Sequence, residues 1–130
     1  MLNPVDYRFL VVEDNLTLAE LYARMLEHLS PRVEVIHDGL EALRYIETSP
    51  PDLVTLDINL PGISGIDILR ASRLRLRLTE MKVIVMTANL VALENPVLQL
   101  ADAALEKPVR KHTLIQTCQR LLNPTEVEEA

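Results

Sequence analysis

One acidic residue, Asp57, stands in the middle of the chain between a short, largely apolar segment and a group of turn-forming residues. The segment before it, Leu53 to Leu56, is partly β-branched, and Pro61-Gly62 follows soon after it. A short apolar run bounded in this way is typical of a buried strand. Ligands of open parallel sheets bind beyond the carboxyl ends of the strands, so Asp57 is a candidate functional residue. On this segment alone, an Asp that caps the following turn is an equally good interpretation.

Polar groups also end three other predicted strands. They are Glu13 with Asp14, Thr87, and Lys107. Because parallel strands bring their carboxyl ends to one edge of a sheet, we expect these groups to converge with Asp57. Three carboxylates in one place repel one another, which either raises a pKa or calls for a divalent cation. Hard oxygen ligands with room for water favour Mg²⁺.

The predicted cluster suits phosphoryl transfer. Asp57 would be the nucleophile and would form an acyl phosphate. The Lys107 ammonium and the Thr87 hydroxyl would contact the phosphoryl oxygens and stabilise the charge that spreads over them. Taken singly, a strand-end hydroxyl and a surface charge are the simpler interpretations of these two residues, but in combination with the acids they indicate a site.

Predicted strands alternate with predicted helices along the whole chain. The strands are expected at residues 8–12, 32–37, 53–56, 81–86 and 103–106, and the helices at 16–29, from 39 to the prolines at 50–51, at 65–77, and around 114–122. Asn15 and Ser64 are candidate helix caps. The end of the third helix also alternates as a strand would, but its length and context favour a helix. This order predicts an α/β fold with a parallel sheet, right-handed crossovers and helices on both faces.

The pattern weakens between Asn89 and Leu100. Pro96 can occupy only the first turn of a helix or must break what precedes it. We therefore expect the fourth helix to be short or irregular.

Size and composition describe one globular domain. The chain has 130 residues, 48% hydrophobic and 25% charged, and contains no apolar run long enough to cross a bilayer. We expect a single domain over residues 1–130, with a core at about 8–122 and an acidic tail at 123–130. The single cysteine, Cys118, is expected in the core and indicates a cytoplasmic protein. With 13 basic and 19 acidic residues the net charge is −6, which argues against direct nucleic-acid binding.

The ordered motifs resemble bacterial response-regulator receiver domains of two-component signalling. The similarity spans about residues 8–122, and the matching motifs are Val12-Glu13-Asp14-Asn15, the run from Leu56 to Gly65, Val85-Met86-Thr87-Ala88 and Lys107-Pro108. The resemblance implies a flavodoxin-like, doubly wound sheet of five parallel strands in the order 2-1-3-4-5. It also implies that a histidine kinase or a histidine phosphotransfer protein phosphorylates Asp57 with Mg²⁺, in a domain that catalyses its own phosphorylation and dephosphorylation but turns over no free substrate.

The resemblance also assigns roles to individual residues. The implied Mg²⁺ ligands are Asp14 and Asp57 directly, Glu13 through water, and the backbone carbonyl of Asn59. Thr87 is similar to the family's switch hydroxyl, Lys107 to its phosphoryl-pairing lysine, and Lys107-Pro108 to its cis peptide.

The chain departs from the family in one region. The family places Tyr or Phe three residues before the lysine, where this chain has Ala104. The segment between Thr87 and Lys107 is slightly short and lacks the usual glycine near Leu100. We expect that the aromatic switch cannot operate and that signalling uses the loop at 89–95 or another face. The Asn59 and Asn89 side chains are expected to flank the site, where they would position or block water.

Two other functions compete with a phosphorylated receiver that signals by partner binding or relay. One is a binding module of the same fold that acts without phosphorylation. The other is a haloacid-dehalogenase-like phosphohydrolase, which needs a second acid two residues after the nucleophile, where this chain has Asn59.

Basic residues cluster at one place, and histidines are scattered. The basic cluster is Arg70, Arg73, Arg75 and Arg77, for which a solvated helix face is the simpler interpretation and a docking surface for an acidic partner the alternative. His28, His37 and His112 are predicted to lie away from the site.

Overall fold

The computed structural model describes residues 7–123, apart from the side chain of Leu90. The strands in this part are β1 (Arg8–Val12), β2 (Arg32–Ile36), β3 (Leu53–Asp57), β4 (Lys82–Thr87) and β5 (Ala103–Glu106). The α-helices are α1 (Leu16–Leu26), α2 (Gly39–Thr48), α3 (Gly65–Arg70) and α4 (Lys111–Leu122). A π-helical turn, η2 (Ala71–Arg75), continues α3, and two 3-10 segments, η3 (Leu90–Glu94) and η4 (Pro96–Leu100), join β4 to β5. The predicted acidic tail lies, from residue 124 onward, outside the described residues.

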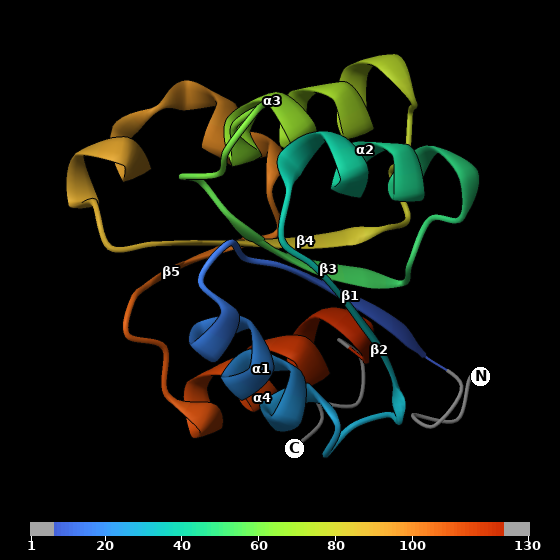
Figure 1. The fold of residues 1–130 in the computed structure, drawn as a ribbon, viewed down its shortest axis with the longest axis vertical. Coiled ribbons are helices and arrows are strands. Elements are labelled where there is room, and N and C mark those ends of the chain that lie inside the picture. The colour runs from blue at the N-terminus through green and yellow to red at the C-terminus, as the bar shows by residue number, and fades with distance from the viewer. Residues whose placement is uncertain (1–6, 124–130) are drawn as a thin grey trace.

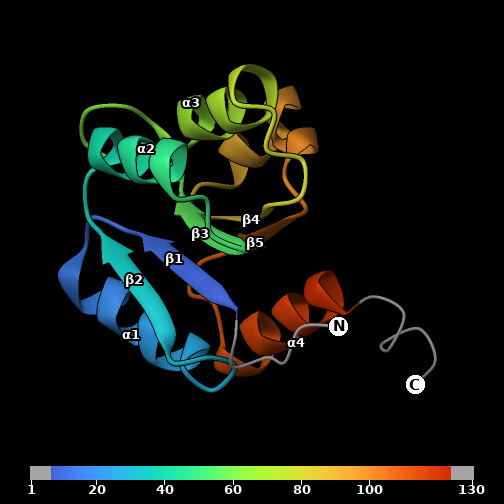
Figure 2. The same ribbon diagram turned by 90° about the vertical axis from the view of Figure 1, so that its right-hand side faces the viewer.

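The strands form one parallel sheet in the order β2-β1-β3-β4-β5, which confirms the predicted flavodoxin-like fold. Helices α1 and α4 cover one face, and α2, α3 and the η segments cover the other (Figures 1 and 2). The neighbouring strands β1 and β3 therefore continue into helices on opposite faces. Such a reversal opens a crevice at the carboxyl ends of the two strands.

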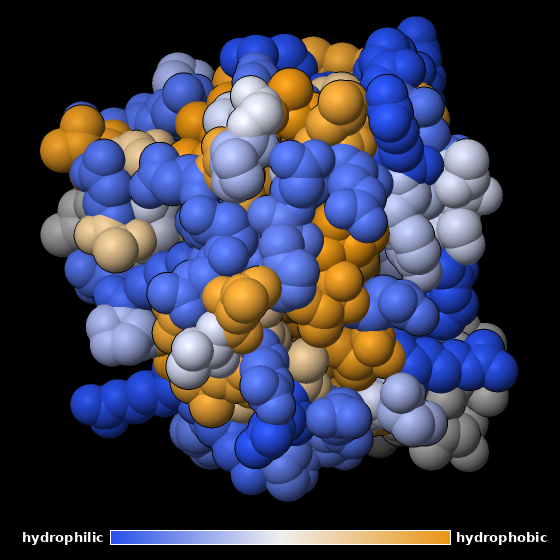
Figure 3. Space-filling view, viewed as in Figure 1, coloured by the Kyte–Doolittle hydropathy of each residue, from blue (hydrophilic) through white to orange (hydrophobic). Residues whose placement is uncertain are grey.

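Each face of the sheet has its own apolar core. Leu10, Val54 and Ile68 belong to the core under α2 and α3, and Phe9 and Leu114 belong to the core under α1 and α4. Strand β3 is buried on both faces, which explains why its sequence is a nearly continuous apolar run. The outer surface seen in Figure 3 is largely polar, with a narrow apolar strip. No helix in the described part of the chain has the length and hydropathy that a membrane crossing requires.

Three predicted helix starts are confirmed by hydrogen-bonded caps. The side chains of Asn15 and Asp38 accept from the backbone N–H of Leu18 and Glu41. Ser64 forms a capping box with Asp67. These caps fix where the chain turns from each strand end into the next helix.

The third helix differs from its prediction. Regular α-helix ends at Arg70, the chain continues as the π-helical turn to Arg75, and Arg77 has a φ of 56°. The first helix also ends earlier than predicted, at Leu26 instead of residue 29. Apolar periodicity did not locate these ends because tertiary contacts of the terminal turns decide them.

The interpretation of Arg73 as part of a solvated basic face is wrong. Its side chain is only 10% exposed and forms an ion pair with Asp102 at 2.8 Å. Its guanidinium also donates to the carbonyl oxygens of Leu78, Met81 and Leu100. Arg73 therefore ties η2 to the start of β4 and to the end of η4.

Between β4 and β5, the sequence predicts a helix that is short or irregular. The structure has two short 3-10 segments there, η3 and η4, so this predicted helix is distinct from α4. Asn89 and Asn95 cap them by accepting from the backbone N–H of Val91 and Val97, both through their Oδ1 atoms. Pro96 occupies the first position of η4, where its missing N–H is not needed. The prediction of an irregular fourth helix is confirmed.

Candidate functional site

The predicted site residues converge at the carboxyl edge of the sheet. Oxygens of Glu13, Asp14 and Asp57 lie within 4.8 Å of one another. Glu13 is 1% exposed and Asp57 4%, whereas Asp14 is exposed. The Lys107 ammonium lies 3.2 Å from Asp57 Oδ2 and pairs with Glu13 Oε1. The strand ends thus bring three acids and one cation together.

Lys107 links the two buried carboxylates. Burial alone would lower the pKa of Lys107, but its hydrogen bond with Glu13 and the charges of Asp57 and Glu13 outweigh burial and raise the pKa. Burial raises the pKa of Glu13, against the opposing effect of the hydrogen bond from Lys107. Lys107 is therefore held protonated, with its charge directed at Asp57.

The loop after Asp57 is packed closely around the carboxylate. Asp57 Oδ1 accepts from the backbone N–H of Asn59 at 3.1 Å. Gly65 is required beside it, because a Cβ at that position would lie 2.2 Å from the Asp57 carbonyl oxygen. The loop therefore turns back over the end of β3, and the Asn59 side chain is exposed.

Thr87 is buried at the end of β4, and its hydroxyl faces the following loop. Its Oγ1 accepts from the backbone N–H of Asn89 at 3.0 Å. The backbone N–H of Lys107 donates to the Thr87 carbonyl at 2.9 Å, but within residues 7–123 no hydrogen bond joins the Thr87 hydroxyl to Asp57 or Lys107. The hydroxyl is thus connected to the start of η3. The Lys107-Pro108 peptide bond at the neighbouring strand end is cis, as the resemblance implied.

His37 is a residue of this site that the sequence analysis missed. Its Nδ1 lies 2.9 Å from the carbonyl oxygen of Glu13, so the prediction that all three histidines lie away from the site is wrong for His37. The one available signal was that His37 directly follows β2, because neighbouring parallel strands end at the same edge of the sheet. Nothing in the sequence indicated which side chain after β2 would turn toward β1.

The model of the response regulator receiver domain family matches residues 9–119. The chain belongs to this family. One relative is the response regulator MprA of Mycobacterium ulcerans (strain Agy99). It is 34% identical to this chain over 128 residues, which cover 96% of this chain and 54% of MprA. The chain therefore spans about half the length of the curated relatives it matches.

Solved structures agree with this assignment. The CheY-like receiver domain protein of Methanospirillum hungatei JF-1 has a TM-score of 0.81 at 32% identity, covering 94% of this chain and 98% of that one. The response regulator TrrA of Thermotoga maritima, solved in complex with Mg(2+)-BeF, has a TM-score of 0.81 at 29% identity, covering 88% and 98%.

Strand β5 carries Ala104 at the position where the resemblance implies a Tyr or Phe. Ala104 pairs with Val85 and Glu106 with Thr87, so Ala104 lies on the same face of the sheet as Thr87. Ala104 is exposed. No aromatic side chain of β5 can therefore follow a movement of the Thr87 hydroxyl.

The donor set of the receiver fits a hard divalent cation. Carboxylates of Glu13, Asp14 and Asp57 provide oxygen ligands from two strand ends, and the exposure of Asp14 leaves one side of the cluster open to water. Oxygen ligands with several retained waters are the preference of Mg²⁺. The residues present are thus compatible with the predicted metal.

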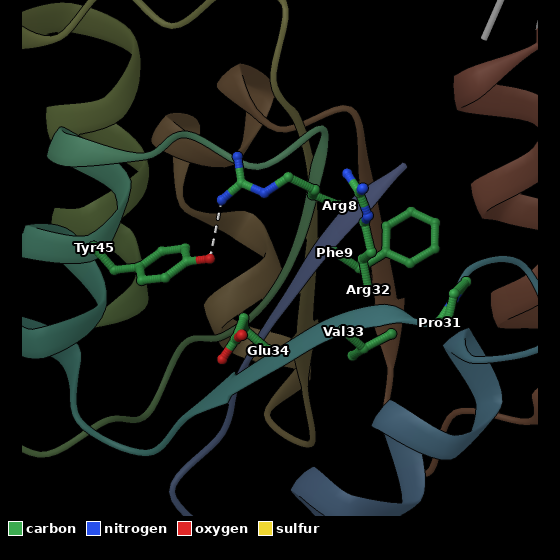
Figure 4. A pocket seen from close by; sticks show the side chains of 7 residues that line it. All are labelled: Arg8, Phe9, Pro31, Arg32, Val33, Glu34 and Tyr45. Carbon is green, nitrogen blue, oxygen red and sulfur yellow. Dashed lines mark hydrogen bonds between the residues drawn. The ribbon is translucent and has the colours of Figure 1, made fainter. Parts of the chain in front are cut away.

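A separate cavity of about 310 Å³ lies away from this site, against the amino-terminal ends of β1 and β2 (Figure 4). Its lining includes Arg8, Arg32, Glu34 and Tyr45. Arg8 Nη2 donates to the Tyr45 hydroxyl at 3.0 Å and to Ser49 Oγ at 2.7 Å. The Arg8 side chain is thus held by the protein itself.

Proposed function

We propose that this receiver domain accepts a phosphoryl group on Asp57, with Mg²⁺, from a histidine kinase or a histidine phosphotransfer protein. The observation that carries the proposal is the position of the Lys107 ammonium, which lies 3.2 Å from Asp57 Oδ2 and pairs with Glu13 within a cluster of three acids. A buried carboxylate that contacts a cation and belongs to an acidic cluster open to water at Asp14 is arranged to receive a dianionic group. TrrA, a structural relative, was solved in complex with Mg(2+)-BeF, which supports the same use of this site.

In the proposed transfer, an Asp57 oxygen forms a bond to phosphorus while the bond between phosphorus and the donor's imidazole nitrogen breaks. Lys107 moves from Glu13 toward the phosphoryl oxygens, whose charge it stabilises. The Thr87 hydroxyl donates to another phosphoryl oxygen. Asp14, Asp57, the Asn59 carbonyl and, through water, Glu13 would hold Mg²⁺, which when bound neutralises charge on the transferred group.

We infer that the signal leaves the site through the start of η3. The Thr87 hydroxyl accepts from Asn89 N–H, and Asn89 Oδ1 accepts from Val91 N–H at 3.0 Å. A rotation of Thr87 toward a phosphoryl group would therefore displace Asn89 and the cap of η3. Val91, which is 71% exposed, would carry this change to the surface. Arg73 holds the other end of the segment at Leu100, so the displacement would be concentrated in residues 89–95.

The phosphoacceptor is tested by the intact mass of the protein after incubation with acetyl phosphate and Mg²⁺, beside Asp57→Asn. We expect a labile phosphoryl adduct on the wild type alone. An adduct on both proteins would assign the phosphoryl group to another residue. The absence of an adduct, with Mg²⁺ binding detected, would refute the proposal.

The output segment is tested separately by the backbone amide signals with and without a phosphoryl analogue. We expect the largest changes from Asn89 to Asn95. Unchanged signals from Asn89 to Leu100 would refute the η3 route while leaving the phosphoacceptor in place.

A binding module that acts without phosphorylation is the second candidate function. The observation that favours it is Ala104, which removes the aromatic part of the family's switch. This candidate predicts that a partner binds the wild type and Asp57→Asn equally in the presence of acetyl phosphate. The proposal of a phosphorylated receiver predicts that acetyl phosphate changes partner binding by the wild type but not by Asp57→Asn.

A further inference from the structure

Three loops meet at the acidic site, and their backbones are tied to one another. The backbone N–H of Glu13 donates to the Ile36 carbonyl at 3.1 Å, and the Glu13 carbonyl contacts His37 Nδ1 at 2.9 Å. Beyond His37, the backbone N–H of Gly39 donates to the Pro61 carbonyl at 3.4 Å. The loop after β2 thus contacts both the loop that carries Glu13 and the loop that follows Asp57.

The contact between His37 and Glu13 has a defined direction. A carbonyl oxygen only accepts hydrogen bonds, so Nδ1 of His37 is the nitrogen that carries a hydrogen and donates it in this contact. The imidazole is otherwise exposed, and among the described residues this is its one hydrogen bond. Within residues 7–123, no other hydrogen bond competes with this contact for the His37 side chain.

The Glu13 carbonyl belongs to the peptide group that leads to Asp14. Because a peptide group is planar, fixing this carbonyl also fixes the direction of the Asp14 N–H and restricts where the Asp14 Cα lies. The Asp14 carboxylate makes no hydrogen bond or ion pair within residues 7–123. Glu13, in contrast, is held through its side chain by Lys107 and by the backbone N–H of Asn15. Of the three candidate carboxylate ligands, Asp14 is thus the one that no side-chain contact among the described residues holds, so its placement depends on its backbone.

We propose that His37 is a positioning residue of the metal site, which orients the Asp14 carboxylate by holding the peptide group between Glu13 and Asp14. The inference rests on the proposed Mg²⁺-dependent function. It adds a partner outside the ligand set, from the loop after β2, which supplies none of the proposed ligands. Outer partners of this kind typically change metal affinity by about 10–100-fold when they are removed.

Isothermal titration calorimetry with Mg²⁺ alone, in the absence of any phosphoryl donor, tests this role. His37→Leu should weaken Mg²⁺ binding by about 10-fold or more. His37→Asn keeps an N–H donor near the position of Nδ1 and should bind Mg²⁺ within about 3-fold of the wild-type affinity. The amide of His37→Gln lies one bond farther out, so this variant should bind Mg²⁺ as weakly as His37→Leu does. His28→Leu is the matched control at another exposed histidine and should bind as the wild type does.

Thermal unfolding of each variant in EDTA separates positioning from folding. We expect all four variants to melt close to the wild type, because His37 is exposed. If His37→Leu is poorly folded, the comparison of Asn with Gln decides. Wild-type affinity in His37→Leu, or equal losses in the Leu and Asn variants, would overturn the inference and leave the proposed function intact. A wild type that binds no Mg²⁺ would refute both.

Discussion

The guanidinium of Arg73, whose side chain is 10% exposed, forms an ion pair with the exposed residue Asp102, at 2.8 Å between Nη2 and Oδ2. The same Asp102 oxygen accepts from the backbone N–H of Val83 at 2.8 Å. Together with the carbonyl oxygens that Arg73 contacts, this pair joins η2, β4 and the start of β5. A π-helical turn, an interior strand and an edge strand of the sheet therefore share one anchor.

Arg73→Met should lower the free energy of unfolding by about 3 kcal/mol, because three backbone carbonyl oxygens lose their donor, at about 1 kcal/mol each, and the Asp102 carboxylate loses its cation. Urea unfolding followed by circular dichroism measures the change. Arg75→Met is the matched control, since Arg75 pairs with Glu47 at the surface, where such pairs contribute less than about 1 kcal/mol. Equal effects of the two substitutions would contradict the anchoring role of Arg73.

Thr87→Val should loosen the start of η3 in the unphosphorylated protein. The backbone N–H of Asn89 loses its acceptor, and a hydrogen bond of this kind contributes about 1 kcal/mol, so hydrogen exchange at Asn89 should accelerate by roughly 5-fold. Thr87→Ser keeps the hydroxyl and should exchange as the wild type does. Exchange at Asn89 that does not distinguish Val from Ser would show that the hydroxyl does not restrain η3.

Lys107→Met removes the cation between two buried carboxylates. In EDTA near pH 7.5, the free energy of unfolding should fall by about 3 kcal/mol. The pKa of Glu13, already raised by burial, should rise further. A carboxyl whose pKa is higher in the folded state does not lower the free energy of unfolding at a pH below its unfolded pKa, here 4.5. It lowers the free energy of unfolding increasingly as the pH rises through the folded pKa. The destabilisation should therefore shrink toward pH 5.

Urea unfolding of Lys107→Met across this pH range measures that trend. Lys111→Met, at an exposed lysine that begins α4, is the control and should change stability little at any pH. A loss of stability that is the same at about pH 5 and pH 7.5 would indicate lost packing of the lysine stem instead of uncompensated charge.

Cys118 should be unreactive in the folded protein. Burial raises the pKa of its thiol from 9.0 to about 12, so at about pH 8 the folded state holds roughly a thousandfold less thiolate than the unfolded state. Iodoacetamide should modify the protein in urea and leave the native protein intact. Stability should be insensitive to this thiol below pH 9.0 and should fall as the pH rises toward about 12. Fast native-state alkylation would show that the α4 side of the core opens readily.

Local chemistry explains why the strands and most helix starts could be predicted. A buried parallel strand such as β3 is apolar on both faces, and Ser64 caps a helix with its own side chain. Both signals depend on residues close together in the sequence. The convergence of Asp57 with Glu13 and Lys107 could also be predicted, because all three follow strands that must end at one edge of a parallel sheet.

The sequence by itself therefore determined the fold class, the five strands and the set of residues that gather at the carboxyl edge. Tertiary structure alone decided that Arg73 is an interior anchor, that the third helix ends in a π-helical turn, and that His37 contacts the Glu13 carbonyl. Periodicity reports which face of a segment is apolar. It carries no information about which distant carbonyl a long or exposed polar side chain will reach, because that distance is set by how the strands and helices pack.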